Sequence, residues 1–410
     1  MSSILTNTSA MVALQTLKGI TQNLEKTQSE ISTGKSVANA RDNAAVWAIS
    51  KVMESDVQGF KGISDSLALG SSTVSVARSA SETVTDLLTQ MKGKIVASQE
   101  SNVDRAKIQT DIVALRDQIG AVVGAAQFNG LNLLSNQSST AGSQTVDILS
   151  SLDRSGSGVA VSEITVAKND IGIKNAVDGA TAGGGANTAI ATLAAGATTT
   201  FMTVLPANVA YGTTYNIESM AGTAVAAANQ VSYVTRNGDT AASVAAEMVN
   251  RLNFVAQREG RTVSFAVNAT DATQIDITNT STTTAVTGIL ATDIDRTTGG
   301  TAGGGLNLLQ KFDVTTSAGA NAALAGIEGL IQTSIKSAAS FGSVQGRIDT
   351  QQKFVDSLTG SLKAGIGTLV DANMEETSAR LQALQVQQQL GVQALSIANQ
   401  SPQSILSLFR

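Results

Sequence analysis

The chain has 410 residues, a net charge of −5, an aromatic content of 3%, and neither histidine nor cysteine. Without those two residue types, thiol nucleophiles, disulfides, zinc–thiolate sites and Ser-His-Asp chemistry are excluded. The net charge and the few aromatic side chains likewise argue against nucleic acid and anionic membranes as partners. We therefore expect a protein that is not an enzyme and that needs no metal and no cofactor.

The N-terminal segment is predicted to be a helix with an apolar stripe at heptad spacing. The stripe consists of Ala10, Leu14, Leu17, Leu24 and Ile31. Gly34 is expected to end this helix in a left-handed conformation. Residues 1–17 carry no charged side chain, which is unusual for a helix that faces solvent.

Two further helices and a hairpin are predicted next. Apolar periodicity indicates a very long helix over about residues 44–98, capped by Asp42 or Asn43, and an amphipathic helix over 103–126. After Asn129-Gly130 the period changes to short alternating runs, separated by a Ser/Gly-rich stretch at 155–158. This alternation predicts a β-hairpin.

The middle of the chain is predicted to be an inserted α+β domain. Residues 178–200 and 297–305 are rich in Gly, Ala and Thr, and we expect them to be flexible joints that bracket the insert. The elements expected between them are strands near 214–218, 231–235, 263–267 and 275–278, and a helix over 240–259. Helical periodicity then returns over 321–363, and Gly365-Ile366-Gly367 is expected to break it.

The last segment, from Asp371 to Arg410, is predicted to contain a helix that Asn373 caps and that runs through Ala398. Its apolar stripe includes Met374, Leu381, Leu384 and Leu395. Residues 381–409 carry no charged side chain, and glutamines supply the polarity instead. Isolated helices of this length are marginal, so each terminal helix needs a partner. Periodicity alone leaves an ordinary hairpin on a monomeric core equally open, but the matched loss of charge favours an antiparallel pair of the two termini.

Together these elements predict a mainly α fold with β insertions, in which both termini form an antiparallel coiled-coil core. The domains we predict are 1–41 with 366–410 (inner terminal helices), 42–175 with 308–365 (outer helices with the β-hairpin), and 176–307 (surface-exposed α+β insert). No basic segment followed by an apolar run opens the chain, and no stretch approaches eighteen apolar residues. We therefore expect neither a cleaved secretion signal nor insertion into a membrane.

Several segments at the two ends resemble bacterial flagellins, the subunits of the flagellar filament. They are Ser3–Asn7, Ile31–Gly34, Asn39–Ala45, Gln127–Leu134 and the stretch from Arg347 to Arg410. The resemblance covers 1–175 and 308–410 and is specific because both ends carry it. The segment 176–307 matches no pattern, as expected for the variable outer insert of that family.

The resemblance implies a homopolymer, alone or together with paralogous flagellins, whose terminal helices pack in concentric layers around a narrow channel. The residues implied in polymerisation and coiled-coil contacts are Leu5, Leu14, Leu17, Leu24, Ile31, Met374, Leu381, Leu384 and Leu395. Gln385, Gln388 and Gln389 would line the channel or the layer beside it, so that unfolded subunits of either charge pass. Hydrogen bonding between helices is an equally good explanation of these glutamines.

The family also implies export without cleavage through the flagellar type III apparatus, to an extracellular filament. An export chaperone would cover the C-terminal apolar residues, and filament cap and hook-junction proteins would be further partners. The residues implied for the chaperone are Leu381, Leu384, Leu395, Ile405, Leu406 and Leu408. A hook-filament junction protein of the same family is the alternative function, and the match along the whole C-terminal end favours the filament subunit.

One departure concerns the patch through which a Toll-like receptor detects many flagellins. Met91 stands where that pattern has arginine, and Leu115 occupies a second basic position. Neither side chain can imitate the bidentate guanidinium. We expect weak or absent detection by the receptor, and the departures resemble those of alphaproteobacterial flagellins.

Overall fold

The computed structural model describes residues 7–155, 158–220, 223–226, 229–289 and 294–406. They form two compact units. The first consists of Met1–Ser64 and Lys353–Arg410, and the second of Asp65–Gln352. The helices α2 (Ala44–Ala97) and α5 (Ser317–Val370) contribute to both units. The predicted division into inner, outer and insert domains stays a prediction.

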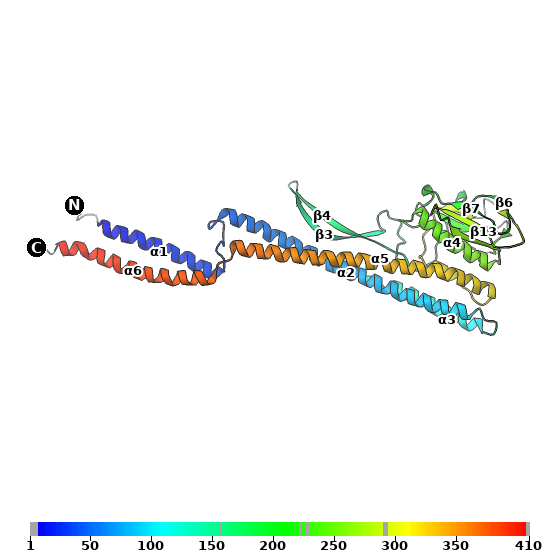
Figure 1. Cartoon of the computed structure of the whole chain (residues 1–410), viewed down its shortest axis with the longest axis horizontal. Helices are drawn as coiled ribbons and strands as arrows, with labels where there is room; N and C mark the ends of the chain where they lie inside the picture. The colour runs from blue at the N-terminus through cyan, green and yellow to red at the C-terminus, as the bar shows by residue number, and fades with distance from the viewer. Residues whose placement is uncertain (1–6, 156–157, 221–222, 227–228, 290–293, 407–410) are drawn as a thin grey trace. The chain divides into compact units, whose positions relative to one another are not determined.

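In the first unit, α1 (Thr8–Thr33) and α6 (Met374–Leu406) lie side by side (Figure 1). Their directions are opposite, because the Asn7 amide donates to the Ala398 carbonyl at 2.9 Å at one end, while Lys35 pairs with Asp371 at the other. The antiparallel pairing of the two termini predicted from their stripes is therefore present in the single chain.

Main-chain hydrogen bonds join the segment that follows α1 to the segment that precedes α6, and we call this contact the joint. Gly34 ends α1 with φ 70°, in the left-handed region where glycine is favoured. Beyond it, the Ser36 N–H donates to the Val370 carbonyl at 2.7 Å, and the Ala372 N–H donates to the Gly34 carbonyl at 3.0 Å. The break after α1 and the break before α6 are thus tied to each other by main-chain hydrogen bonds.

The prediction that Gly365-Ile366-Gly367 breaks the penultimate helix is wrong. The helix α5 continues to Val370, and the chain turns at residues 371–373, where Asn373 caps α6 by accepting from the Glu375 N–H at 3.2 Å. A Cβ atom placed on Gly365 would lie 3.0 Å from Cε of Met53 on α2. Glycine therefore serves close helix packing at this position, and packing offsets its low helix propensity.

In the second unit, the helical part consists of α2, α3 (Arg105–Ala125) and α5. Apolar side chains of α2 and α5 are fully buried, and small polar residues let the helices approach each other. Thr85 on α2 donates to the Ser334 hydroxyl on α5 at 3.0 Å, and Ser81 lies 3.3 Å from the Ser337 hydroxyl. These helices confirm those expected over residues 44–98 and 103–126.

Two hairpins follow α3. The strands β1 (Gln127–Phe128) and β2 (Leu131–Asn132) are joined by Asn129 and Gly130, both with positive φ, as a two-residue hairpin turn requires. The strands β3 (Thr145–Ser155) and β4 (Gly158–Ala167) form the long predicted hairpin, whose two connecting residues lie outside the described part of the chain. Ile148 of β3 packs on α2 at Gly70, where a Cβ atom would lie 2.5 Å from Ile148 Cδ1.

The insert is built from antiparallel sheets around one helix. A four-stranded sheet has the order β11-β8-β15-β5, and a three-stranded sheet has the order β12-β13-β7. The strands of the first are β5 (Thr181–Gly185), β8 (Thr214–Ile217), β11 (Val231–Val234) and β15 (Ile294–Thr298). Those of the second are β7 (Thr198–Thr203), β12 (Val263–Val267) and β13 (Gln274–Asn279).

Shorter elements complete the insert. The two-stranded sheets are β6 (Ile190–Leu193) with β14 (Val286–Ile289), and β9 (Ser219–Met220) with β10 (Thr223–Ala224). The short helices are η1 (Pro206–Asn208) and η3 (Asn307–Lys311).

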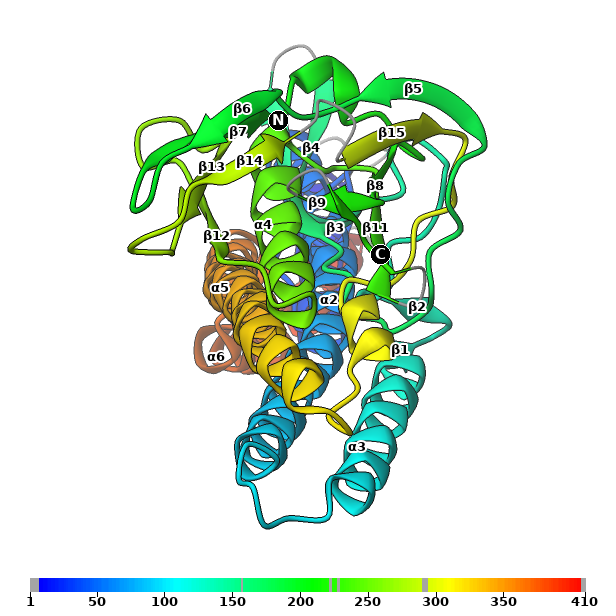
Figure 2. The same ribbon diagram turned by 90° about the vertical axis from the view of Figure 1, so that its right-hand side faces the viewer.

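The helix α4 (Ala241–Arg258) belongs to the insert and packs beside the long helix α5, as Figure 2 shows. A capping box of Thr240 and Ser243 starts it. Farther along, the Phe254 ring stacks on Phe312 with centroids 5.7 Å apart. A Cβ atom on Gly326 of α5 would lie 3.1 Å from Phe312, so a glycine on α5 makes room for this aromatic pair.

The prediction that residues 178–200 and 297–305 are flexible joints is wrong. The first stretch contains β5 and β6, and the second contains the end of β15. Beyond β15, the Gly304 N–H donates to the Lys174 carbonyl at 2.8 Å, and Thr301 and Val177 exchange hydrogen bonds. A Cβ atom on Gly304 would overlap the Gly172 carbonyl. The glycines are needed because the two backbone segments that enter and leave the insert are in direct contact.

A buried polar cluster holds these connecting segments together. The Asp170 carboxylate accepts from the backbone N–H groups of Asn136 at 3.0 Å and Gly305 at 3.2 Å. The Arg236 Nε donates to the Gly303 carbonyl at 3.1 Å and lies 3.9 Å from the Asp170 carboxylate. One guanidinium therefore links the insert to both connecting segments.

The loop that carries Arg236 is itself fixed by buried groups. The Arg236 N–H and the Tyr233 hydroxyl both donate to the Asp239 carboxylate, at 2.8 Å and 2.6 Å. Burial raises the pKa of Tyr233 well above its ordinary value, so its hydroxyl stays a donor. Burial also raises the pKa of Asp239, although the nearby Arg236 opposes this.

Replacing Arg236 by leucine is expected to lower the free energy of unfolding of the second unit by about 3–5 kcal/mol, because it leaves Asp170 as a buried charge without its cation. Denaturant titration followed by circular dichroism measures the loss. The matched control is Arg347→Leu, at an exposed position on α5, which should change the value by no more than about 0.5 kcal/mol. Equal losses in both variants would contradict a linking role for Arg236.

Candidate functional site

The contact between α1 and α6 is a seam with heptad spacing on α6. The seam residues of α6 are Thr377, Leu381, Leu384, Gln388, Gly391, Leu395 and Ala398, all buried or half-buried. Leu384 is 8% exposed, and Leu24 on α1 is 9% exposed. At Gly391 the helices approach closely, because a Cβ atom there would lie 3.2 Å from Cδ1 of Leu17. The seam thus combines leucine packing with one point of close backbone approach.

Six of the predicted interface residues lie in this seam: Leu17, Leu24, Ile31, Leu381, Leu384 and Leu395. Two others do not, since Leu14 is 57% exposed and Met374 is 44% exposed. On α1 the position between Ala10 and Leu17 is taken by Ala13, which the sequence analysis missed. Leu5 lies outside the described residues. The role of all these residues in contacts between copies stays a prediction.

Outside the seam, both terminal helices expose large apolar side chains. On α1 they are Met11 (63% exposed), Val12 (64%) and Leu14 (57%). On α6 they are Val386 (56%), Leu390 (57%), Val392 (54%) and Ile397 (69%). We call these seven residues together the exposed apolar face. Of the four on α6, Val386, Leu390 and Ile397 share one side of the helix, whereas Val392 lies nearer the seam. Scattered single apolar residues on a surface are normal, whereas contiguous exposed apolar patches mark interaction sites.

None of the four α6 residues of the exposed apolar face was predicted from the sequence to lie at an interface. A signal was nevertheless present. Val386, Leu390 and Ile397 follow the same spacing of four and seven residues as the seam, on another side of the helix. A helix with two apolar stripes has more than one partner, whereas an ordinary surface helix has a single apolar stripe.

The three glutamines predicted to face a channel do not share one environment. Gln385 and Gln389 are exposed, whereas Gln388 is half-buried in the seam between Leu384 and Gly391. Of the three, only Gln388 lies at the contact with α1, and both explanations of the glutamines, a neutral channel and hydrogen bonding between helices, stay predictions. Their orientation in an assembly stays a prediction.

The residues predicted to contact a chaperone also divide into two groups. Leu381, Leu384 and Leu395 are covered by α1 in the seam. The side chains of Ile405 and Leu406, and the whole of Leu408, lie outside the described residues. A chaperone that binds the first group must therefore take the place of α1.

Two lysines and a glutamate of this unit form ion pairs near the joint. The Lys51 ammonium donates to the Glu54 carboxylate at 2.6 Å, and Lys35 lies 3.9 Å from the same residue. The bond from Lys51 holds the pKa of Glu54 below its ordinary value. Because both partners are solvated, such pairs contribute little stability.

Neither a metal centre nor a membrane span occurs within the described ranges. They hold no group of three or more acidic side chains placed to bind a metal ion. None of their helices is long and apolar enough to cross a bilayer.

Neither of the two residues at the receptor-related patch is fully exposed. Met91 is fully buried in the packing of α2, and Leu115 on α3 is half-buried. An arginine at position 91 would place a charge inside the helical core. The difference from the receptor-detected pattern therefore concerns the packing around this position as well as the identity of one side chain. Weak or absent detection by the receptor stays a prediction.

Comparison with known proteins gives the same family at both ends of the chain. Residues 4–139 match the bacterial flagellin N-terminal helical region, and residues 324–409 match the bacterial flagellin C-terminal helical region. The chain is 37% identical to Flagellin A of Rhizobium meliloti over 100% of both chains. It is 30% identical to Flagellin FljK of Caulobacter vibrioides, over 100% of this chain and 99% of the other.

Among solved structures, the flagellar hook associated protein-3 of Legionella pneumophila matches with 10% identity and a TM-score of 0.37, covering 78% of this chain and 98% of the other. A TM-score this low supports no inference.

Leu384→Ala is expected to weaken the α1–α6 seam by about 2–3 kcal/mol, because a buried leucine is lost and a cavity remains. Hydrogen exchange of the amides of both helices should become faster. Leu390→Ala, six positions further along the same helix at a residue 57% exposed, serves as the control and should leave the exchange rates unchanged. If Leu390→Ala accelerated exchange as much as Leu384→Ala, the seam would be wrongly placed.

Proposed function

Because the chain belongs to the bacterial flagellin family, we propose that it is a structural subunit that self-assembles into the helical, tubular filament used for swimming. The observation that carries this proposal is the exposed apolar face. It lies on the same two helices whose seam already buries one apolar stripe of each. Those helices can therefore pair within a subunit and still contact other subunits.

The energetics support association of several copies. Full burial of one Val, Leu, Ile or Met side chain contributes about 1.5–3 kcal/mol, so covering the exposed apolar face contributes on the order of 10 kcal/mol per subunit before the entropy of association is subtracted. The face occurs on both helices, which allows each copy to contact more than one neighbour. Contacts between unlike surfaces form open helical polymers where the rotation between copies does not close a ring, whereas a two-fold dimer would end the assembly.

The remaining partners follow from membership of the family. We propose export through the flagellar type III apparatus and an extracellular filament, with cap and hook-junction proteins at its ends. An export chaperone would bind the C-terminal helix before assembly. Since α1 covers Leu381, Leu384 and Leu395, such a chaperone would also keep the two terminal helices apart until export.

The proposal is tested by adding filament seeds to the purified chain and following growth by negative-stain microscopy. The full chain should form long tubes, and a chain lacking residues 374–410 should not. Leu390→Lys should remain folded as a monomer yet stop growth, because a charge at the exposed apolar face opposes its burial. Gln257→Lys on α4, an exposed position in the insert, adds the same charge and should grow normally. If the full chain only capped the seeds and did not extend them, the result would favour a hook-filament junction protein instead.

A neutral channel wall predicts a separate effect of charge at Gln385, which is exposed and outside the seam. Gln385→Lys should shorten filaments in cells, because subunits with acidic segments would be retained during transit, while the thermal stability of the monomer should not change. Gln385→Ser keeps the wall neutral and should support filaments of normal length. Full-length filaments from the lysine variant would count against transit as the reason for the glutamines.

A further inference from the structure

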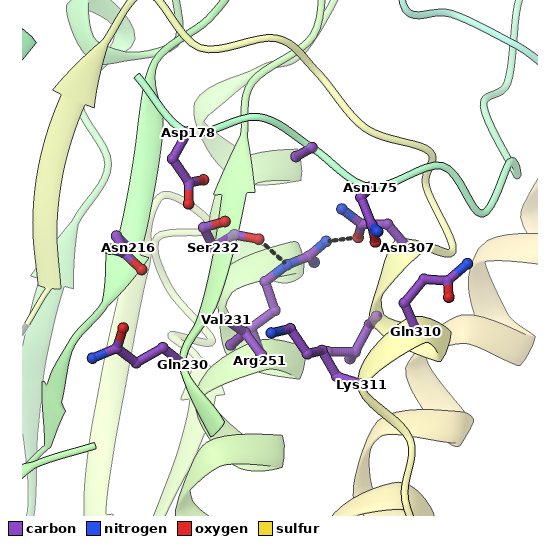
Figure 3. Close-up of a pocket in the computed structure, with 12 residues that line it drawn as sticks. Asn175, Asp178, Asn216, Gln230, Val231, Ser232, Arg251, Asn307, Gln310 and Lys311 are labelled. Carbon is purple, nitrogen blue, oxygen red and sulfur yellow. Dashed lines mark hydrogen bonds between the residues drawn. The ribbon is translucent and has the colours of Figure 1, made fainter. Parts of the chain in front are cut away.

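A cleft of about 520 Å³ lies in the insert, beside β11. β11 is an edge strand of the four-stranded sheet, and strands β8 and β11 form one wall of the cleft. The other wall comes from η3 and from residues 175–178, the segment that leads into the insert (Figure 3). The volume is within the range of about 300–1,000 Å³ that small-molecule sites occupy.

The lining of this cleft is polar, unlike that of most small-molecule sites. Five of its residues are carboxamides and one is a hydroxyl: Asn175, Asn216, Gln230, Asn307, Gln310 and Ser232. None of the described residues that line it is aromatic. Any ligand that fits must therefore exchange hydrogen bonds over most of its surface, and it cannot stack on a ring.

Arg251 fixes the geometry of the cleft. Its side chain is 1% exposed, and its Nε donates to the Ser232 carbonyl at 3.1 Å. Its Nη2 donates to the Asn307 side chain at 2.7 Å, as Figure 3 shows, and its Nη1 donates to the Glu247 carboxylate at 2.6 Å. One guanidinium thus joins β11 to η3 across the cleft, so the two walls are held in place before a ligand binds.

The charges at the cleft do not favour an anion. The positive charge of Arg251 is neutralised by Glu247, and its donors are used by the protein. The other two charged residues of the lining are Asp178 and Lys311, which have opposite signs. The Glu218 carboxylate adds a negative charge beside the lining, where it accepts from Asn216 at 2.7 Å. With no cation of the lining left unbalanced, the lining is suited to a neutral ligand.

We propose that this cleft binds a neutral saccharide of one or two sugar units. A carboxamide offers one acceptor and two donor hydrogens, and a sugar hydroxyl both donates and accepts. Four of the five carboxamides already use one polar atom within the protein, because Asn216, Gln230 and Gln310 each donate one N–H and Asn307 accepts from Arg251. The remaining amide hydrogens and oxygens of the lining can bind adjacent sugar hydroxyls. Without an aromatic platform the affinity is expected to be weak, in the millimolar range. The sugar can be free in solution or a unit of a polysaccharide.

The test is saturation-transfer NMR on the full-length monomer with maltose, cellobiose and lactose as free disaccharides, and with dextran as the polymer. Glucuronate and inorganic phosphate are the anionic probes. We expect transfer to at least one neutral sugar and none to the anions. Transfer to dextran alone would assign the ligand to a polysaccharide, and transfer to a disaccharide would show that the free sugar is sufficient.

Two variants locate the binding. Asn175→Leu and Gln230→Leu each remove a carboxamide from the lining, and each should weaken the affinity about tenfold or more. Gln257→Ala, at an exposed position of α4 outside the lining, is the control and should bind normally. Circular dichroism establishes that all three are folded. The proposal is overturned if no neutral sugar shows transfer, if the anions bind better, or if the lining variants bind as well as the control.

Discussion

The antiparallel contact between α1 and α6 is the interaction on which the fold of the first unit depends. It joins Asn7 to Ala398, which are 391 positions apart, so the two ends of the sequence act as one structural element. Closing a flexible loop of that length costs about 5 kcal/mol. The seam and the main-chain hydrogen bonds of the joint together offset this cost. The exposed apolar face of the two helices stays available to other copies. The fold of a subunit and its proposed assembly therefore depend on the same two helices.

Heptad spacing was enough to predict the terminal pair and most of its seam, because leucines such as Leu24 and Leu384 repeat at the period of the contact. It was not enough to choose between Ala13 and Leu14, since spacings of three and four both lead from Ala10 to Leu17. The choice depends on where α6 packs against α1, and α6 lies far away in the sequence.

Glycine produced the two errors in the fold. At Gly365, within α5, it allows close packing on Met53 of α2, and at Gly304 it allows two backbone segments to touch. In a sequence these uses look the same as a helix break or a hinge, because each follows from the missing side chain. The cleft of the insert could not be predicted for a related reason. Arg251 reads as a polar residue on an amphipathic helix, and only the fold brings Ser232 and Asn307 to its guanidinium.

The absence of charge along most of α6 has a consequence for the environments in which an assembly would hold together. Residues 381–406 of this helix carry no ionic group, so screening of charges by dissolved salt would not weaken contacts made by its exposed apolar face. Burial of apolar surface weakens on cooling instead. Cohesion through this face would therefore withstand dilute salt and respond to temperature.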